Sequence, residues 1–401
     1  MNSLDTELSR RLAELDEQSL RRRLRAVESP QTPELLVGGR DLLSFSSNDY
    51  LGLSNHPRLR EAMIEGVQRF GVGAGASRLI CGNLRPHVDL DEAIAEFKGV
   101  EAALSFSTGY ATALGAICSL VSKEDIVILD RLVHASIIDA ARLSRGTLRV
   151  FDHNDLGQLE DILKWSEGAR RKVGGSRSQV LIVTESVFSM DGDLAPLRDI
   201  IALKERYGAW LMVDEAHGTG LYGEHRRGVI EAMEMGGFVE VQMGTLGKAL
   251  GVSGGYIAGS RALIDWLVNR ARSFIFSTAP PPAVAWAAKE AVALVKSEEG
   301  ERLRQVLWSR VNRVKEQVIE ARWTLPAAQS AILPLRVGAE ETALAVAAKL
   351  LEQGLWVPAI RYPSVARGEA RLRLTVTAAH TLDQIDRLGA ALRSCASQPI
   401  A

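Results

Sequence analysis

The stretch "QVLIVTESVFSMDGDLAPLRDIIALKERYGAWLMVDEAHGTG", residues 179–220, contains two short apolar runs separated by a helical pattern. The runs at 179–186 and 209–216 are almost continuously apolar, which is typical of strands that are buried on both faces. The segment between them, 194–208, repeats apolar residues at helical spacing. This order of strand, helix and strand predicts a βαβ unit and therefore an α/β fold with a mostly parallel sheet.

The same pattern continues on both sides of this stretch. Residues 125–130 form another short apolar run, and 239–245 and 254–260 read as two more strands. Only eight residues join the last two, whereas a parallel crossover needs about a dozen or more. We therefore expect this pair to be antiparallel, with its connecting loop at one edge of the sheet.

The rest of the chain divides into three predicted parts. Leucines at positions 4, 8, 12, 15 and 20 recur at near-helical spacing among charged residues, which predicts an amphipathic arm over 4–26. A proline-rich break, "STAPPPAVAW" (277–286), precedes a helical pattern to about 322 and then alternating strand and helix patterns. We predict an N-terminal helical arm (1–44), a large α/β domain (45–285) and a small α+β domain (286–401).

Composition excludes several classes of protein. With 46% hydrophobic and 24% charged residues, the 401-residue chain is typical of a globular protein. A net charge of −1 predicts no attraction to nucleic acid or to a membrane surface. Three scattered cysteines, a charged N-terminus without an apolar run, and apolar runs too short to span a membrane indicate a cytoplasmic protein.

Several segments match a known motif but lack the structural context that the motif requires. "GVSGG" (251–255) matches a hydrolase elbow, but a strand pattern follows it instead of a helix. "GVGAGA" (71–76) follows a helical pattern, so a dinucleotide site is not expected there. "GTLGK" (244–248) lacks the spacing of a P-loop, and the seven scattered histidines predict no metal site.

The loop "GTLGKALGVSGG", residues 244–255, places one lysine among five glycines. Lys248 is interpreted either as an exposed lysine in a turn or as a residue that contacts a bound ligand. Ligands gather at the carboxyl ends of strands in such sheets, and Asp214 and His217 also follow a strand. A lysine with an aspartate partner for a ring nitrogen is the signature of pyridoxal phosphate sites. The alternative for Asp214 is a helix cap or a loop ion pair.

A phosphate group would also need donors. The segment "STGYAT" (107–112) offers the backbone N–H groups of Gly109 and Tyr110 at the start of a helical pattern, which is a suitable anion site. Ser107 or Thr108 would cap an ordinary helix there, and the two interpretations are compatible. His134 follows the strand at 125–130 and either stacks on an aromatic ring or is structural.

Five motifs in order resemble the α-oxoamine synthases. They are "SSNDYLGLSNHP", "ESVFSMDGD", "VDEAHGTG", "GTLGKALG" and "RLRLTVTAAH", and the resemblance runs from about residue 20 to the C-terminus. The family consists of pyridoxal phosphate enzymes with the aspartate-aminotransferase-like fold. It implies an obligate homodimer whose two subunits share each active site.

The resemblance implies a role for each matching position. Lys248 holds the cofactor covalently, Asp214 pairs with the ring nitrogen, His217 hydrogen-bonds the ring oxygen and His134 stacks on the ring. The remaining implied residues are Gly109, Tyr110 and Thr245 for the phosphate, Ser189 for the cofactor, Ser277 and Thr278 for the neighbouring subunit's phosphate, Asn48 and Arg373 for the amino-acid carboxylate, and Arg21 and Ser364 for the acyl chain or product. For Arg21, within the basic run 21–25, a solvated surface is the alternative. Tyr50 is assigned to packing.

The implied activity is the condensation of an amino acid with an acyl thioester, with loss of CO₂. The expected substrates are L-alanine and pimeloyl-CoA or a pimeloyl carrier-protein thioester. Glycine with acetyl-CoA, the glycine C-acetyltransferase reaction, is the alternative within the family. An aminotransferase on the same fold and a non-catalytic binding scaffold are the other two alternatives.

Overall fold

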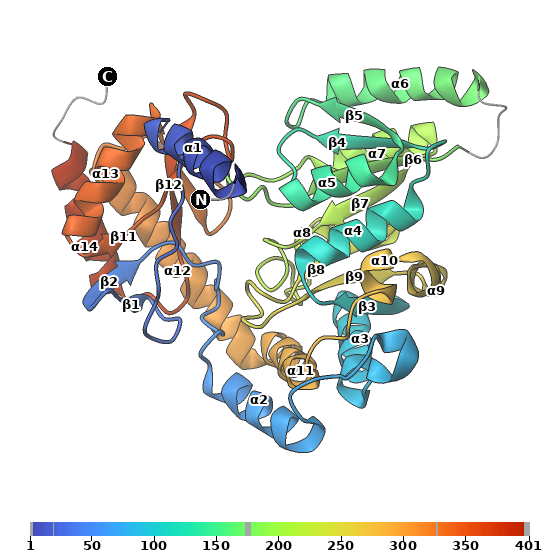
Figure 1. The fold of residues 1–401 in the computed structure, drawn as a ribbon, viewed down its shortest axis with the longest axis horizontal. Helices are drawn as coiled ribbons and strands as arrows, with labels where there is room; N and C mark the ends of the chain where they lie inside the picture. Colours follow the sequence, from blue (N-terminus) through green and yellow to red (C-terminus); the bar gives the residue numbers. More distant parts are fainter. Residues whose placement is uncertain (1–2, 19, 173–177, 326–327, 397–401) are drawn as a thin grey trace.

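A seven-stranded sheet lies at the centre of the computed structural model, which describes residues 3–18, 20–172, 178–325 and 328–396 (Figure 1). The strand order is β3-β9-β8-β7-β6-β4-β5. The strands are β3 (Ala102–Phe106), β4 (Ile126–Asp130), β5 (Thr147–Phe151), β6 (Val180–Glu185), β7 (Trp210–Asp214), β8 (Val241–Thr245) and β9 (Gly255–Gly259).

The parallel part of this sheet contains four apolar runs that the sequence identified, β4, β6, β7 and β8, and one strand that it missed, β5. All residues of β4 and β6 are buried, and β6 pairs in parallel with both β4 and β7. This confirms the mostly parallel sheet. The predicted antiparallel pair is also confirmed, because β8 and β9 exchange antiparallel hydrogen bonds.

The position of that pair in the sheet was predicted wrongly. β9 is not an edge strand, because β3 pairs with it on its other side in an antiparallel register. The five residues of β3 are all buried, and the sequence analysis did not include them among the strands. The lysine loop therefore connects two interior strands, and β3 forms the edge.

Helices surround the sheet, as Figure 1 shows. The predicted helix between β6 and β7 is confirmed as α7. The helices around the sheet are α3 (Arg85–Lys98), α4 (Gly109–Leu120), α5 (Ala135–Ser144), α6 (Leu156–Lys172), α7 (Leu197–Tyr207), α8 (Val229–Ala232), α9 (Arg261–Arg270) and α10 (Arg272–Ile275), together with the short helices η1 (Arg78–Gly82) and η2 (Gly236–Phe238).

The C-terminal part combines three helices with two small sheets. One sheet has the order β10-β13-β12 and the other the order β1-β2-β11. The elements are α12 (Glu298–Glu320), α13 (Glu340–Glu352), α14 (Leu382–Ala396), β1 (Glu34–Val37), β2 (Arg40–Ser44), β10 (Ile332–Gly338), β11 (Leu355–Trp356), β12 (Ala359–Ile360) and β13 (Ala370–Thr375). The N-terminal hairpin β1–β2 thus completes a sheet with a strand more than 300 positions away.

The N-terminal arm is only partly helical, in contrast to the prediction for residues 1–44. Helix α1 (Ser3–Glu17) ends before the basic run at 21–25, and none of its residues is buried. Continuing the helix would place arginines 21 and 25 one turn apart, where like charges repel. Arg21 instead pairs with Asp16, with 2.6 Å between Nη1 and Oδ2.

The helical stretch predicted from the proline-rich break to about 322 is two helices. α11 (Pro282–Lys296) packs against α2 (Pro57–Phe70) and α3, whereas α12 packs against α14. Ser297 separates them and caps α12 by accepting from the N–H of Gly300. The predicted boundary at 285/286 therefore falls inside α11. The three-part division itself stays a prediction.

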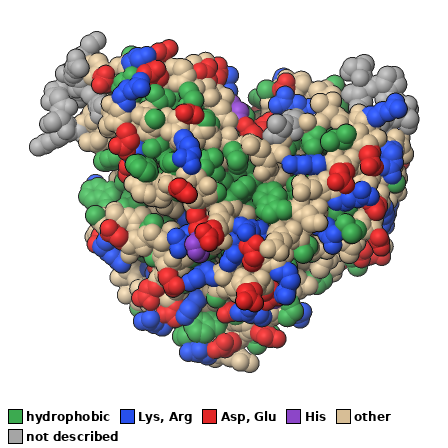
Figure 2. Space-filling view, turned by 180° about the vertical axis from the view of Figure 1, so that it is seen from behind, with side chains coloured by type: hydrophobic (Ala, Val, Ile, Leu, Met, Phe, Trp, Pro, Cys, Tyr) green, Lys and Arg blue, Asp and Glu red, His purple; other side chains and the backbone are tan. Residues whose placement is uncertain are grey.

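The surface carries charges of both signs. Seen from behind, acidic and basic side chains are interspersed, and a notch separates the two lobes (Figure 2). None of the helices in the described ranges is long and apolar enough to cross a membrane. Within the same ranges, no cluster of three or more His, Cys, Asp or Glu side chains is arranged to hold a metal ion.

Candidate active site

The lysine loop, residues 246–254, is held at the carboxyl end of β8. Backbone bonds run from Leu246 N to Gly254 O (3.0 Å) and from Val252 N to Leu246 O (2.9 Å). Gly251 has a φ of 67°, and a Cβ atom there would lie 2.6 Å from backbone atoms of Leu53 and Ser54. At this position glycine is therefore required for packing within the chain.

His217 lies between Lys248 and a tyrosine. Its Nε2 is 2.8 Å from Lys248 Nζ, and its Nδ1 is 2.6 Å from the hydroxyl of Tyr50. Burial holds the pKa of His217 well below its ordinary value, and the charge of Lys248 adds to this. Burial also lowers the pKa of Lys248. The site therefore favours a neutral imidazole and an amine that loses its proton readily.

Asp214 ends β7 next to this pair. Its Oδ1 accepts a hydrogen bond from Ala216 N at 2.9 Å, and the side chain is buried. Burial raises the pKa of Asp214, while the positive charge of Lys248 opposes that rise. A buried carboxylate of this kind is costly unless a cation faces it. The geometry therefore fits a positively charged ring nitrogen.

His134 caps the helix that follows β4. Its Nδ1 is 2.8 Å from Ser136 Oγ, which fixes the orientation of the imidazole. Burial lowers its pKa, and the charge of Lys248 acts in the same direction. A neutral imidazole held in this way can stack on a ring.

Arg373 reaches the site from β13 in the C-terminal part. Its Nη1 and Nη2 donate to Asn48 Oδ1 at 3.1 and 3.2 Å, and its Nε donates to Ser189 O at 2.6 Å. The side chain is buried, yet it has no carboxylate partner within 4.0 Å among the described residues. Because a buried guanidinium is expensive without an anion, this group is suited to binding a ligand carboxylate.

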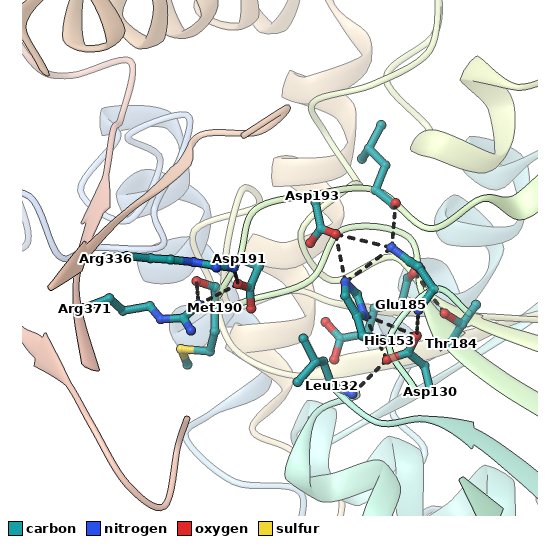
Figure 3. Close-up of polar contacts among 12 residues, drawn as sticks. Asp130, Leu132, His153, Thr184, Glu185, Met190, Asp191, Asp193, Arg336 and Arg371 are labelled. Atoms are coloured by element: carbon teal, nitrogen blue, oxygen red, sulfur yellow. Dashed lines mark hydrogen bonds and ion pairs between the residues drawn. The ribbon is translucent and has the colours of Figure 1, made fainter. Parts of the chain in front are cut away.

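The loop that carries Ser189 is fastened to both parts of the molecule (Figure 3). On one side Arg371 Nη1 lies 2.6 Å from Asp191 Oδ1. On the other side His153 lies between two carboxylates, 3.0 Å from Asp130 Oδ1 and 2.8 Å from Asp193 Oδ2. The burial of His153 is outweighed by these two acids, which raise its pKa to about 10.

The start of α4 forms an anion cradle beside Thr245. Thr108 caps this helix, so the N–H groups of Gly109 and Tyr110 have no acceptor within it. Gly109, Thr245 and Gly255 lie close together here. A Cβ atom on Gly109 would lie 3.8 Å from Thr245 Oγ1, and a Cβ atom on Gly255 would lie 3.0 Å from Gly109 N. The side chain of Tyr110 is exposed and donates to Asp139. Helix N-termini of this kind are suited to phosphate.

The remaining predicted site residues lie apart from this group. Ser277 and Thr278 line a narrow cavity together with Ser107, just before the helix cap. Arg21 contacts Asp16 at the end of α1, and Ser364 is exposed in a loop after β12. In this single chain the structure brings neither Arg21 nor Ser364 into contact with the groups around Lys248.

Two residues of the site were missed by sequence reasoning. Tyr50 was assigned to packing, but its hydroxyl bonds His217 and also donates to Asn48 Oδ1 at 3.3 Å. Glu185 ends β6 and accepts from His134 N at 2.5 Å. A usable signal existed for Glu185, because it is a carboxylate at the end of an apolar strand, as Asp214 is.

This site and fold define the chain as a member of a known class. The family model "Aminotransferase class I and II" matches residues 40–392. A solved serine palmitoyltransferase from S. paucimobilis with bound PLP superimposes with a TM-score of 0.90 at 28% identity, and the match covers 98% of each chain. A solved 8-amino-7-oxononanoate synthase from Francisella tularensis gives a TM-score of 0.74 at 27% identity, covering 88% of this chain and 97% of that one.

Curated relatives are more similar in sequence. An 8-amino-7-oxononanoate synthase from Janthinobacterium sp. is 44% identical over 402 residues, which is 99% of this chain and 100% of the relative. One from Geobacter sulfurreducens is 46% identical over 381 residues, 95% of each chain. The chain belongs to the aminotransferase class I and II family, in the branch of the 8-amino-7-oxononanoate synthases.

Proposed function

We propose that this protein condenses L-alanine with a pimeloyl thioester, carried by CoA or by a carrier protein, in biotin biosynthesis. The products are 8-amino-7-oxononanoate, CO₂ and the free thiol. The names of the relatives support this reaction, and so does the closeness of Lys248, His217 and Asp214 in the structure.

One observation carries the proposal: an unbroken chain of hydrogen bonds runs from the lysine to the unpaired arginine. It passes from Lys248 to His217 (2.8 Å), to Tyr50 (2.6 Å), to Asn48 (3.3 Å) and to Arg373 (3.1 Å). An amine that can move a proton and a guanidinium that can hold a carboxylate thus lie on one network. An α-amino acid needs both when its Cα proton is removed.

The site fits pyridoxal phosphate, which the solved relative contains. Lys248 would hold it, Asp214 would face its ring nitrogen, and His134 and His217 would contact the ring and its oxygen. Gly109, Tyr110 and Thr245 would bind its phosphate, with Ser189 nearby. When bound, this group supplies the electron sink for a carbanion at Cα.

Each of the chain's own residues in the site would then have a separate role in the reaction. Arg373 and Asn48 hold the substrate carboxylate, and the Lys248 amine takes the Cα proton. His217, kept neutral by burial, is placed to polarise a carbonyl oxygen. Asp214 stabilises positive charge on the ring, and such electrostatic stabilisation is usually the largest catalytic contribution.

A homodimer is part of this proposal. Ser277 and Thr278 would reach the phosphate bound by the neighbouring subunit, and Arg21 and Ser364 would lie near the acyl chain when substrate is bound. Sedimentation of the purified protein checks the dimer. A monomer that binds cofactor with full occupancy would contradict this arrangement.

The first test is thiol release from pimeloyl-CoA by the cofactor-loaded protein, with L-alanine and separately with glycine. We expect rapid release with alanine only, and none from a Lys248→Ala variant. Release from acetyl-CoA with glycine, and none from pimeloyl-CoA, would assign the glycine C-acetyltransferase reaction instead. Conversion of the cofactor by an amino acid alone would indicate an aminotransferase, and no cofactor absorbance would indicate a binding scaffold.

A further inference from the structure

A second buried carboxyl group, Glu185, lies beside Asp214 at the carboxyl edge of the sheet. β6 and β7 are parallel, and their register pairs Glu185 directly with Asp214. The two residues are 2% and 5% exposed. Among the described residues, neither carboxylate has a side-chain nitrogen of Lys, Arg or His within 4.0 Å. Two neighbouring carboxylates that are buried without ion pairs cannot both ionise cheaply, so one of them holds a proton.

The surroundings decide which of the two keeps the proton. Burial raises the pKa of Glu185 to about 8, and the charge of Asp214 contributes to that rise. For Asp214, the largest influence after burial is the positive charge of Lys248, which favours the ionised form. Glu185 is therefore the neutral partner near pH 7, and Asp214 is the anion.

Glu185 has a second contact that a neutral acid can still make. Its Oε1 accepts from the backbone N of His134 at 2.5 Å, and this links the end of β6 to the residue that caps α5. His134 Nδ1 is in turn fixed by Ser136 Oγ at 2.8 Å. The position of the imidazole thus depends on Glu185 through the backbone and on Ser136 through the ring.

We propose that Glu185 is a positioning residue that acts as a neutral carboxylic acid, fixing His134 while leaving the negative charge at the ring nitrogen to Asp214. This inference rests on the proposed cofactor site and goes beyond it, because it assigns a protonation state and a task to a residue outside the expected set. Several charged and titratable groups face Glu185. They are Asp214 on β7, Lys248 in the lysine loop, Asp130 at the end of β4, His134 after that strand, and Tyr50 before α2.

The test compares the same chemical change on two neighbouring strands. Glu185→Gln keeps an oxygen acceptor and a neutral group, so we expect cofactor affinity and kcat within about twofold of wild type. Asp214→Asn removes the required charge and is expected to lower kcat by several powers of ten. Glu185→Ala loses the hydrogen bond to His134 and is expected to weaken cofactor binding about tenfold, measured by titrating visible absorbance.

A second readout needs neither cofactor nor substrate. The folded-state pKa of Glu185 is raised from 4.5 to about 8, so its stabilising effect is present at low pH and is lost as pH rises toward 8. We expect the melting temperature of the cofactor-free wild type to fall relative to Glu185→Gln between about pH 5 and about pH 8. The difference should then stay constant above that range.

Each outcome decides the proposal. If Glu185→Gln loses cofactor affinity as Glu185→Ala does, an ionised carboxylate is required and the proposal is wrong. If Glu185→Ala binds cofactor as wild type does, Glu185 positions nothing. A difference in melting temperature between Glu185→Gln and wild type that does not change with pH would also overturn the proposal. Failure of the wild type to release thiol from pimeloyl-CoA would reject the proposed function, and leave these binding and melting results unaffected.

Discussion

The hydroxyl of Tyr50 lies 2.6 Å from His217 Nδ1, although the two residues are separated by 167 positions in the chain. Burial raises the pKa of Tyr50 to about 12, so the hydroxyl stays protonated. We therefore expect Tyr50→Phe to leave a buried ring nitrogen of His217 without its partner. Such an unsatisfied group costs about 1–3 kcal/mol.

For Tyr50→Phe we predict a fall in kcat/KM of about ten- to a hundredfold, with a loss of stability of about 1 kcal/mol in urea unfolding. The matched control is Tyr222→Phe, which removes a hydroxyl that donates to Gln329 O. It should cost similar stability and leave kcat/KM unchanged. Equal kinetics for both variants would show that the hydroxyl of Tyr50 serves packing only.

Lys248→Ala should abolish both proton transfer and retention of the cofactor. We predict a decrease of about 10³-fold or more in thiol release, together with loss of the visible absorbance after gel filtration. Lys123→Ala is the control, because that side chain is 78% exposed. A Lys248→Ala rate within tenfold of wild type would assign the proton transfer to another group.

Arg373 should govern affinity for the amino acid and not for the acyl donor. Replacing it by Lys removes the fork that bonds Asn48 and Ser189, and charge-assisted hydrogen bonds are worth about 1.5–3 kcal/mol. We predict that Arg373→Lys raises the KM for L-alanine about ten- to a hundredfold, with the KM for pimeloyl-CoA unchanged. Arg336→Lys on the neighbouring strand β10 is the control, because that side chain is 54% exposed and pairs with Asp191 instead of Asn48. A rise in KM for both substrates of Arg373→Lys would contradict the assignment.

The sequence allowed five of the seven strands and the centre of the site to be predicted for one physical reason. Apolar runs mark buried strands, and the carboxyl ends of parallel strands meet at one edge, so Asp214, His217 and Lys248 were expected together. Tyr50 and Arg373 come from segments outside that sheet. No local pattern links residues so distant, and Arg373 was expected only through the resemblance.

The hairpin of β1 and β2 was missed although a signal was present. Gly38 and Gly39 separate two short apolar runs, and both have positive φ, at 57° and 71°. A Gly-Gly pair between such runs is a hairpin signature. The prediction of a helical arm over residues 1–44 included this turn, whereas helix α1 ends at Glu17.

His153 should make the stability of the protein fall at high pH. Its folded-state pKa is about 10 against an ordinary value of 6.5, because Asp130 and Asp193 outweigh its burial. A raised pKa means that the stabilisation is complete below about pH 6.5 and is lost as pH rises through about 10. We predict that the melting temperatures of wild type and His153→Gln differ at pH 6 and converge toward pH 10. A difference in melting temperature that does not change with pH would show that His153 is not protonated between Asp130 and Asp193 in the folded protein.

The reversal of β9 relative to its neighbours has a mechanical consequence for the lysine. A crossover between parallel strands would leave one end of the lysine segment in a long connection, whereas here both ends run directly into hydrogen-bonded strands. The main chain around Lys248 is thereby restrained from two directions, and the freedom needed during turnover is confined to the four methylene groups of one side chain.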